Sequence, residues 1–403
     1  MPASRTTWRR PKRVLFFAEA VTLAHVARPA ALAAALAPRH HVVIATDRRY
    51  LRFAESRDWE TVSLRSISSE EFLGRLSRGR PVYDLDTLRS YVREDLEIIE
   101  KVRPDLIVGD FRLSLSVSAR KVGIKYIALT NAYWSPYYIG GFPMPVLPFT
   151  KFLPVGVAKR IFGTVSPILM PLHCRPLNQL RKEHGMRPLG NELRRVYTDA
   201  DCTIYVDLPE MFPTRSLPES HRFLGPVLWS PAVAKPVWWN AVPAERPVVY
   251  ATVGSSGDPS LLRKTLEALS GLPVTVIAST AGQQLPSPPA NAYIAEYLPG
   301  VEAAARSELV ICNGGSPTSQ QALAAGVPVL GIASNMDQFL NMQGVERVGV
   351  GRTLRADRAT VAGIRQAAAT LLDSVATRAN AKQLSAAFAS GAAAARLAEI
   401  VEA

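Results

Sequence analysis

Residues 309–330, LVICNGGSPTSQQALAAGVPVL, decide the fold class of this chain. The apolar run 309–312 is typical of a buried parallel strand, and a helix-forming segment follows the two glycines. The apolar run that begins at 327 predicts a second strand. A strand, a tight turn, a helix and a further strand form the repeating unit of open parallel sheets. This stretch therefore predicts an α/β protein.

The turn within this stretch has the composition of a phosphate-binding loop. Gly314 and Gly315 allow close backbone approach, while Ser316 and Thr318 place hydroxyl groups in the first turn of the predicted helix. Free amides at a helix N-terminus and the positive end of the helix dipole favour a diphosphate. An ordinary strand, turn and helix with a capping hydroxyl is the alternative. The sequence contains neither the P-loop pattern GxxxxGK[ST] nor a complete GxGxxG.

Downstream of this stretch, polar side chains follow the next predicted strand, 327–332. Asp337 and Gln338 are adjacent and lie just beyond its carboxyl end. Their acceptors and donors suit paired sugar hydroxyls. A solvated loop would have a similar composition.

Upstream, the second half of the chain begins with another α/β unit. Residues 247–253 predict a strand, 254–258 a turn of small residues and 259–269 a helix, with further strands at 274–278 and 292–295. The preceding segment, 225–240, is rich in proline and turn residues and suits a linker.

The first half also alternates strands and helices. Apolar runs at 13–18, 40–46, 105–109 and 123–130 predict strands. Helix-forming segments at 26–36 and 113–122 lie between members of this series. We therefore expect a doubly wound parallel sheet in this half as well.

Two polar residues lie at carboxyl ends of strands in this first sheet, the edge where open α/β sheets bind ligands. His25 is in the loop after the strand 13–18, and Asp110 directly follows the strand 105–109. If they meet, the imidazole can act as a base and the carboxylate can orient it. The alternative is a half-buried or capping histidine and an aspartate that caps the next helix. We interpret the other five histidines as structural.

The segment 133–172 is aromatic, rich in proline and nearly uncharged. Lys151, Lys159 and Arg160 interrupt it. Such a composition favours a lipophilic pocket or an interfacial patch. A long insertion packed on its own domain is the alternative.

Composition limits the remaining classes. The chain has 403 residues, 48% of them hydrophobic, which suggests two domains with separate cores. Its net charge of +13 favours anionic partners, and because no nucleic-acid-binding motif accompanies the basic residues we expect no nucleic acid. The three cysteines predict reduced thiols, and no export signal is evident, so we expect a cytoplasmic protein. The uncharged run 126–150 contains four prolines, which argue against a spanning helix.

Taken together, these motifs resemble family 1 glycosyltransferases of the GT-B fold, which include bacterial antibiotic and carotenoid glycosyltransferases and the UDP-glycosyltransferases of plants and animals. The strongest resemblance is the ordered set formed by 312–318, the GVP motif at 326–328 and the Asp337–Gln338 pair. Weaker support comes from 24–36, Asp110, the LGP motif at 224–226 and Gly254 with Ser255.

The resemblance implies two Rossmann-like domains that face each other across a cleft. We expect an acceptor-binding domain at 1–225, a linker at 226–245, a donor-binding domain at 246–380, and a C-terminal helix at 381–403 that packs back on the first domain.

The resemblance also implies a role for each matching residue. His25 is expected to be the general base and Asp110 its support. Three further groups are expected to bind substrates: Asn313, Gly314, Gly315, Ser316, Thr318, Gly254 and Ser255 the donor diphosphate; Asp337 and Gln338 the donor sugar; Tyr297 and Leu298 the nucleobase. From the aromatic segment, we expect Tyr133, Trp134 and Phe142 to contact the acceptor.

One position departs from the family pattern. Asn313 stands where the family usually has a histidine that contacts the diphosphate. Asparagine can donate a hydrogen bond but cannot become cationic, so the departure leaves weakened diphosphate stabilisation, or compensation by another cation, as open alternatives.

The expected reaction is inverting transfer of a hexose from UDP or dTDP to a hydroxyl group of a lipophilic acceptor, such as a lipid or a natural product. We expect no cofactor and no metal, because the sequence has no DxD-type carboxylate cluster. A peripheral contact with the inner face of the membrane is consistent with the apolar segment. Three alternatives stay open: a sugar-nucleotide epimerase, a catalytically silent partner protein, and a membrane-associated transferase that uses a polyprenyl-linked sugar.

Overall fold

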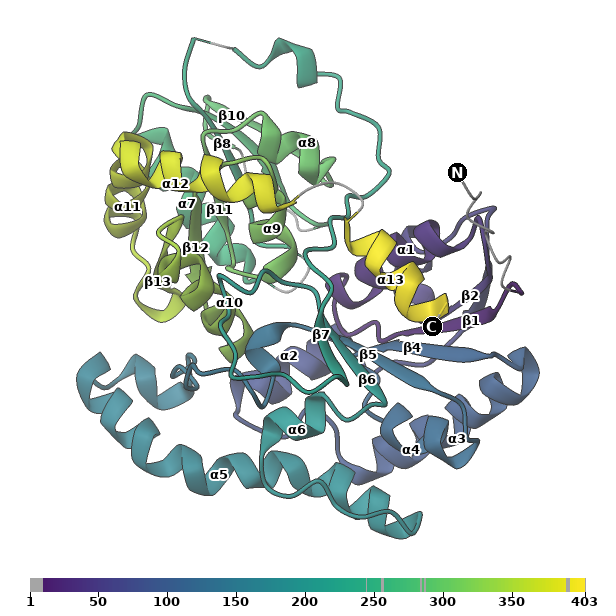
Figure 1. Cartoon of the computed structure of the whole chain (residues 1–403). Coiled ribbons are helices and arrows are strands. Elements are labelled where there is room, and N and C mark those ends of the chain that lie inside the picture. Colours follow the sequence, from purple (N-terminus) through teal and green to yellow (C-terminus); the bar gives the residue numbers. More distant parts are fainter. Residues whose placement is uncertain are drawn as a thin grey trace.

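The computed structural model describes residues 10–243, 245–254, 257–282, 285, 288–388 and 392–402. Within these residues the chain forms two sheets, each flanked by helices (Figure 1). The first sheet runs in the order β3 (Glu60–Ser63), β2 (His41–Thr46), β1 (Arg13–Ala18), β4 (Leu106–Asp110), β5 (Tyr126–Thr130), β6 (Cys202–Tyr205) and β7 (His221–Phe223). The second runs in the order β10 (Ala292–Ala295), β9 (Thr275–Ser279), β8 (Val248–Thr252), β11 (Leu309–Cys312), β12 (Val329–Ala333) and β13 (Gly351–Arg355).

Every strand pair in both sheets is parallel. The helices of the first half are α1 (Ala24–Leu36), α2 (Ser69–Ser77), α3 (Leu85–Val102), α4 (Leu115–Lys121), α5 (Val155–Glu183) and α6 (Leu193–Tyr197). Those of the second half are α7 (Pro259–Ser270), α8 (Gly300–Ala305), α9 (Ser316–Ala324), α10 (Met336–Arg347), α11 (Val361–Asp373), α12 (Val375–Ser385) and α13 (Ala392–Glu402). This arrangement confirms the predicted α/β class with two parallel sheets.

Strand β1 shows why the central strands of this protein are continuous apolar runs. Val14 and Phe16 pack in the core on the α1 side of the sheet, whereas Leu15 and Phe17 pack in the core on the opposite side, near α3 and α4. Helices cover both faces, so neither set of side chains meets water. The strands expected at 13–18 and 292–295 have these bounds in the structure.

The first helix begins earlier than the sequence predicts. Helix α1 starts at Ala24 rather than at 26, so His25 lies in its first turn and not in the preceding loop. The backbone amide of His25 already donates to the carbonyl of Thr22, which starts the helical geometry before any capping side chain is needed. The effect is to fix the backbone of His25 rigidly beside the sheet edge.

Helix α5 is an element that the sequence did not predict. Its 29 residues include Pro167, Pro171 and Pro176, each of which removes a backbone donor and costs about 3 kcal/mol in a helix interior. Figure 1 shows this helix along the lower edge of the molecule, away from both sheets.

The C-terminal helices divide between the two halves. Helix α12 packs on α9 beside the second sheet, whereas α13 lies against α1 of the first (Figure 1). Leu397 and Val401 of α13 are buried in the core that contains α1, and Arg396 donates to the carbonyl of Leu224 at 2.7 Å. The chain therefore returns to its first half at its end.

Candidate active site

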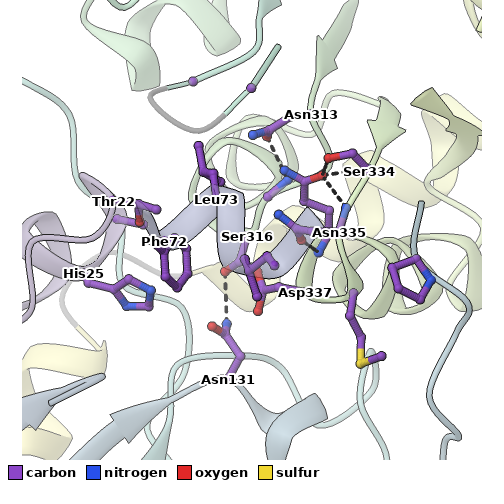
Figure 2. Close-up of a pocket in the computed structure, with 18 of the residues that line it drawn as sticks. Thr22, His25, Phe72, Leu73, Asn131, Asn313, Ser316, Ser334, Asn335 and Asp337 are labelled. Atoms are coloured by element: carbon purple, nitrogen blue, oxygen red, sulfur yellow. Dashed lines mark hydrogen bonds between the residues drawn. The ribbon is translucent and has the colours of Figure 1, made fainter. Parts of the chain in front are cut away.

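A cavity of about 610 Å³ lies where the carboxyl ends of the two sheets meet. His25, Asp110 and Asn131 line it from the first sheet, and Asn313 and Asp337 line it from the second. Figure 2 shows side chains from both halves of the chain directed into this one space. The structure thus brings together residues that are up to 312 positions apart in the sequence, because each follows a parallel strand at the same edge.

His25 and Asp110 meet, as the sequence predicts. The Nδ1 atom of His25 lies 2.7 Å from Oδ1 of Asp110, and the two side chains are 19% and 1% exposed. A carboxylate only accepts hydrogen bonds, so this contact places the proton on Nδ1 and the lone pair on Nε2. Asp110 therefore selects the tautomer in which His25 can accept a proton at Nε2.

Arg28 is a third member of this group that the sequence analysis did not identify. Its guanidinium lies 2.9 Å from both carboxylate oxygens of Asp110 and 3.0 Å from Nδ1 of His25. Burial opposes its charge, but the carboxylate of Asp110 raises the pKa of Arg28 above its ordinary value. Arg28 follows His25 by three positions, so both side chains lie on one face of α1, a spacing that could have identified it.

The ring of Phe111 packs against one face of the imidazole of His25. Its ring stacks on the ring of His25 with centroids 4.8 Å apart and an interplanar angle of 16°. The backbone of Phe111 has φ 61°, a left-handed conformation that costs about 1–2 kcal/mol in a non-glycine residue. That turn directs the side chains of Asp110 and Phe111, which are consecutive, toward the same histidine, and such strain is typical of functional sites.

The opposite wall of the cavity contains the N-terminus of α9. The N-cap residue of this helix is Gly315, which has no side chain that could cap it. Gly315, Ser316 and Thr318 line the cavity there, so the positive end of the helix dipole is directed into it. The hydroxyl of Ser316 accepts a hydrogen bond from Nδ2 of Asn131 at 3.0 Å, which joins this wall to the first sheet.

The glycine turn before α9 is shaped by its own side chains. Gly314 has φ 79° and its amide donates to Sγ of Cys312, while the amide of Gly315 donates to Oδ1 of Asn313 at 3.1 Å. Asn313 thus holds the turn closed, a role that needs an acceptor and no charge. The structure therefore places Asn313 in the cavity wall as a brace of the turn.

Asp337 and Gln338 differ in their availability. Asp337 lines the cavity and accepts a hydrogen bond from Nε1 of Trp134 at 2.8 Å. The Oε1 atom of Gln338 instead accepts from the amide and hydroxyl of Ser334, and Gln338 forms a capping box with Asn335 at the start of α10. Gln338 is buried, and its carbonyl group is committed to the helix start.

Tyr297 and Leu298 both line the cavity, beside an aromatic cluster. The ring of Tyr297 lies 5.4 Å from that of Phe53, which in turn lies 5.9 Å from Trp229. These rings come from both halves of the chain, and their planes are inclined by 59° and 81°, so a nucleobase would stack on a single ring of the cluster. Gly254 lines the cavity with φ 62°, and Ser255 lies outside the described residues.

The three expected acceptor contacts differ in position. Trp134 lines the cavity, but Tyr133 and Phe142 do not. Tyr133 is fully buried against Phe212, with ring centroids 5.1 Å apart, and Phe142 packs on the outer side of Trp134. Tyr133 is therefore a core residue and Phe142 a partly buried residue beside Trp134, because an aromatic composition does not indicate which rings face the cavity.

Beyond His25 the cavity becomes apolar. Phe72, Leu73 and Leu76 of α2 line one side, and the N-terminal half of α5 lines the other. His173 of α5 also lines this part, and burial lowers its pKa below the ordinary value. The sequence analysis treated His173 as structural, because nothing in its local pattern indicates that α5 turns it inward.

Two further polar groups brace the two halves. The carboxylate of Asp207 accepts hydrogen bonds from Asn131 and from Gln320 of α9. Burial raises the pKa of Asp207 from 3.8 to about 6. Asn131 directly follows β5, as Asp110 ends β4, so its position at a strand end could have identified it.

Among the described residues, no three His, Cys, Asp or Glu side chains gather in a way that could hold a metal ion.

Comparison with known proteins gives consistent results. Residues 263–403 match the family described as Erythromycin biosynthesis protein CIII-like, C-terminal domain. The chain is 50% identical over 381 residues to a PGL/p-HBAD biosynthesis glycosyltransferase of Mycobacterium tuberculosis, with 94% of this chain and 89% of the relative covered. It is 53% identical over 351 residues to a PGL/p-HBAD biosynthesis rhamnosyltransferase of Mycobacterium bovis, with 87% and 78% covered.

A solved structure of a spinosyn rhamnosyltransferase complexed with thymidine diphosphate has the same fold. It superposes with a TM-score of 0.69 and 20% sequence identity, and the match covers 96% of this chain and 100% of the other.

Proposed function

The chain belongs to the family 1 glycosyltransferases of the GT-B fold, and from this premise we propose that it moves a hexose from a pyrimidine nucleoside diphosphate to a hydroxyl group of a lipophilic acceptor, with inversion at the anomeric carbon. One observation carries the proposal. The His25–Asp110 pair and the uncapped N-terminus of α9 line the same cavity. A base and an anion-binding helix end in one space suit the two ends of a glycosyl transfer.

The donor diphosphate binds at α9. The first-turn amides and the hydroxyls of Ser316 and Thr318 offer donors to its oxygens, and the helix dipole favours its charge. The glycine turn lets the diphosphate approach the backbone closely. The donor sugar lies toward Asp337, and the nucleobase stacks near Tyr297 and Leu298.

The transfer follows in one displacement. The Nε2 atom of His25 takes the proton of the acceptor hydroxyl, and its oxygen forms a bond to the anomeric carbon. The bond from that carbon to the diphosphate breaks, and the electron pair stays on the diphosphate. Amides of α9 stabilise this negative charge, while Asp110 stabilises the imidazolium that forms. The helix end supplies the positive field, so the proposed reaction uses neither a metal nor a cofactor.

The nucleotide is UDP or dTDP, and the sugar class is a hexose or a deoxyhexose. One relative is named a rhamnosyltransferase, and the structural neighbour was solved with thymidine diphosphate. The acceptor is lipophilic because the cavity beyond His25 is lined by apolar side chains of α2 and α5. Relatives named for PGL biosynthesis agree with a glycolipid product. We place the reaction in the cytoplasm.

Calorimetric titration with UDP, dTDP and GDP tests the donor site. We expect micromolar binding of UDP or dTDP, about −8 kcal/mol, and at least tenfold weaker binding of GDP. The preferred nucleotide then selects the donor sugars for transfer assays with a lipophilic alcohol. These assays are repeated with EDTA, which we expect to leave the rate unchanged. Failure of all three nucleotides to bind would contradict the proposal and favour a silent partner protein.

A further inference from the structure

The two halves of α5 have different surroundings. In the C-terminal half, Cys174, Leu177 and Leu180 are buried in a core shared with α3 and α6. In the N-terminal half, residues 155–173, Ala158 alone is buried. The most apolar window of α5 is long enough to cross a membrane, yet only 6% of it is buried. Half of the helix is thus anchored in the domain, and half is an apolar surface that the described protein leaves uncovered.

The uncovered half carries large side chains on its outer side. Phe152, just before the helix, is 85% exposed, and Ile168 is 71% exposed. Val157 is also exposed, and none of these three lines the cavity. Single exposed apolar residues are common in soluble proteins, but a contiguous group marks an interaction site. We call the exposed surface formed by Phe152, Val157 and Ile168, and by the residues between them in the sequence, the α5 patch.

The charged residues within the α5 patch and the sequence around it have one sign. The sequence from Phe111 to Lys182 contains no Asp or Glu. Lys151, Lys159 and Arg160 are exposed within the patch. A cationic rim around an apolar centre complements an anionic lipid surface, where the apolar side chains enter the acyl boundary and the cations meet headgroups. The same rim disfavours a second copy of this chain, since pairing two patches would bring like charges together.

The cavity opens within the same surface. Ile161, Val165 and Leu169 line the cavity and are also 41%, 37% and 47% exposed. They lie between the outward side chains of the α5 patch and the interior that leads to His25. A lipophilic molecule at the patch therefore has a continuous apolar path to the base.

We propose that the α5 patch docks on the surface of an anionic lipid bilayer and that the acceptor enters the cavity directly from this bilayer. The proposal rests on the proposed function for the identity of the acceptor. The helix lies on the bilayer and does not cross it, because its C-terminal half is part of the core between α3 and α6. Docking holds the cavity mouth at the lipid surface, so the acceptor tail stays out of water during entry.

Co-sedimentation with extruded vesicles tests the proposal with the full-length enzyme. One set of vesicles contains phosphatidylcholine alone, and the other contains phosphatidylcholine with about a third phosphatidylglycerol. We expect binding to the anionic vesicles that weakens at least tenfold when salt rises to 0.5 M, in keeping with a short Debye length. Binding to neither set, or equal binding to both at every salt concentration, would overturn the proposal.

Matched variants locate the contact. We expect Phe152→Glu with Ile168→Glu to weaken vesicle binding at least tenfold while the nucleotide affinity stays unchanged, which shows that the fold is intact. Val375→Glu is the control, since Val375 is 72% exposed on α12 and lies far from α5 in the sequence. Wild-type binding in the double variant would overturn the proposal. Sedimentation velocity of the free enzyme should show a monomer, and a dimer that the double variant abolishes would assign the patch to a second copy instead.

The test separates this proposal from the proposed function. Transfer to a short, water-soluble alcohol should occur at the same rate in the wild type and the double variant, whereas transfer to an acceptor embedded in vesicles should fall at least tenfold. If the wild type transfers the sugar to neither acceptor, this result would contradict the proposed function itself. Equal transfer from vesicles in wild type and variant would contradict only the docking.

Discussion

The two walls of the cavity are built in different ways. The wall formed by the second sheet includes a contiguous turn and helix N-terminus with small polar side chains, residues 313–318, together with residues that follow β8, β9 and β12. The opposite wall combines His25 of α1, Asp110 of β4 and apolar side chains of α2 and α5, which together span residues 25–173 of the sequence. The first wall suits a constant ligand, the diphosphate, and the second suits a ligand that varies between enzymes.

This difference shows how much of each binding surface a short segment of sequence can form. Backbone amides and a helix dipole bind any nucleoside diphosphate, so a short contiguous segment is sufficient for them. An apolar pocket is defined by the shape that several distant helices make together. The first wall should therefore be sensitive to single backbone changes, and the second to changes in the base and in its supporting contacts.

The largest effect is expected at the base. His25→Ala removes the proton acceptor at the acceptor side while leaving α9 untouched, so kcat should fall by about 10² to 10⁴. The dissociation constant of the nucleotide should stay within about twofold, as measured by calorimetry.

His41→Ala is the matched control, because His41 is exposed at the start of β2. His173→Ala removes the other histidine of the cavity, and it should cost less than tenfold. Equal losses for His25→Ala and His173→Ala would remove His25 from its role.

A stability effect is expected where the two walls meet. Asp207 has a pKa of about 6 in the folded protein, above its ordinary value of 3.8. The folded state therefore holds this proton to higher pH, and the stability that it contributes is present below pH 4 and lost as the pH rises through 6. Asp207→Asn stays neutral, so between pH 4 and pH 7 the difference in unfolding free energy should shift in favour of the variant by up to about 3 kcal/mol.

Urea unfolding at pH 4 and at pH 7 checks this expectation. The difference between Asp207→Asn and wild type should be small at pH 4 and should grow by pH 7. A difference that does not change with pH would show that Asp207 is already charged in the folded protein at pH 4.

The next effect is expected at the glycine turn of the donor wall. Gly314 has φ 79°, and a Cβ atom there would lie 2.8 Å from Cγ of Met342. Gly314→Ala should therefore strain the turn by about 1–2 kcal/mol and weaken nucleotide binding about tenfold. The comparison is Gly163→Ala on α5, where a Cβ atom would meet nothing within 4 Å. That variant should leave the dissociation constant unchanged, and equal weakening by both would contradict a local role for Gly314.

The smallest effect is expected at the contact between the walls. Trp134→Phe keeps an aromatic ring in the cavity but removes the hydrogen bond to Asp337. Because the lost hydrogen bond only orients Asp337 and leaves its carboxylate in place, kcat/KM for the donor sugar should fall by less than about tenfold. Trp229→Phe changes a tryptophan at the nucleobase end of the cavity without touching Asp337. If both variants lose the same amount for every donor sugar, Asp337 does not select the sugar.

The sequence was sufficient for the parts of the molecule that short patterns encode. The central strands of both sheets and the turn before α9 follow from apolar runs, and the rule that strand ends gather at one edge brings His25 and Asp110 to the same edge. The strands β3, β6, β7 and β13 were not predicted, and the contact between His25 and Asp110 was left conditional. Gln338 lines the cavity, as the sequence suggested, but the hydrogen bonds that its carbonyl oxygen accepts from Ser334 could not be predicted from a side-chain pattern.

The remaining features depend on tertiary packing. The prolines of α5 predict a broken segment, and the helix forms nevertheless because its C-terminal half packs against α3 and α6. Tyr133, Trp134 and Phe142 have similar local sequences, and only the surrounding core decides that Trp134 reaches the cavity. Arg28 was overlooked because it is a buried cation, although its spacing from His25 on α1 contained the signal.

The stereochemistry of the product tests the central claim most directly. The account places the base and the leaving diphosphate on opposite walls of one cavity, so transfer should occur in a single displacement. With a donor of known anomeric configuration, the coupling constant of the anomeric proton in the purified product should show complete inversion. Retention of configuration would require either two displacements or attack from the face of the leaving diphosphate, and it would contradict His25 as the base that activates the acceptor from the opposite wall.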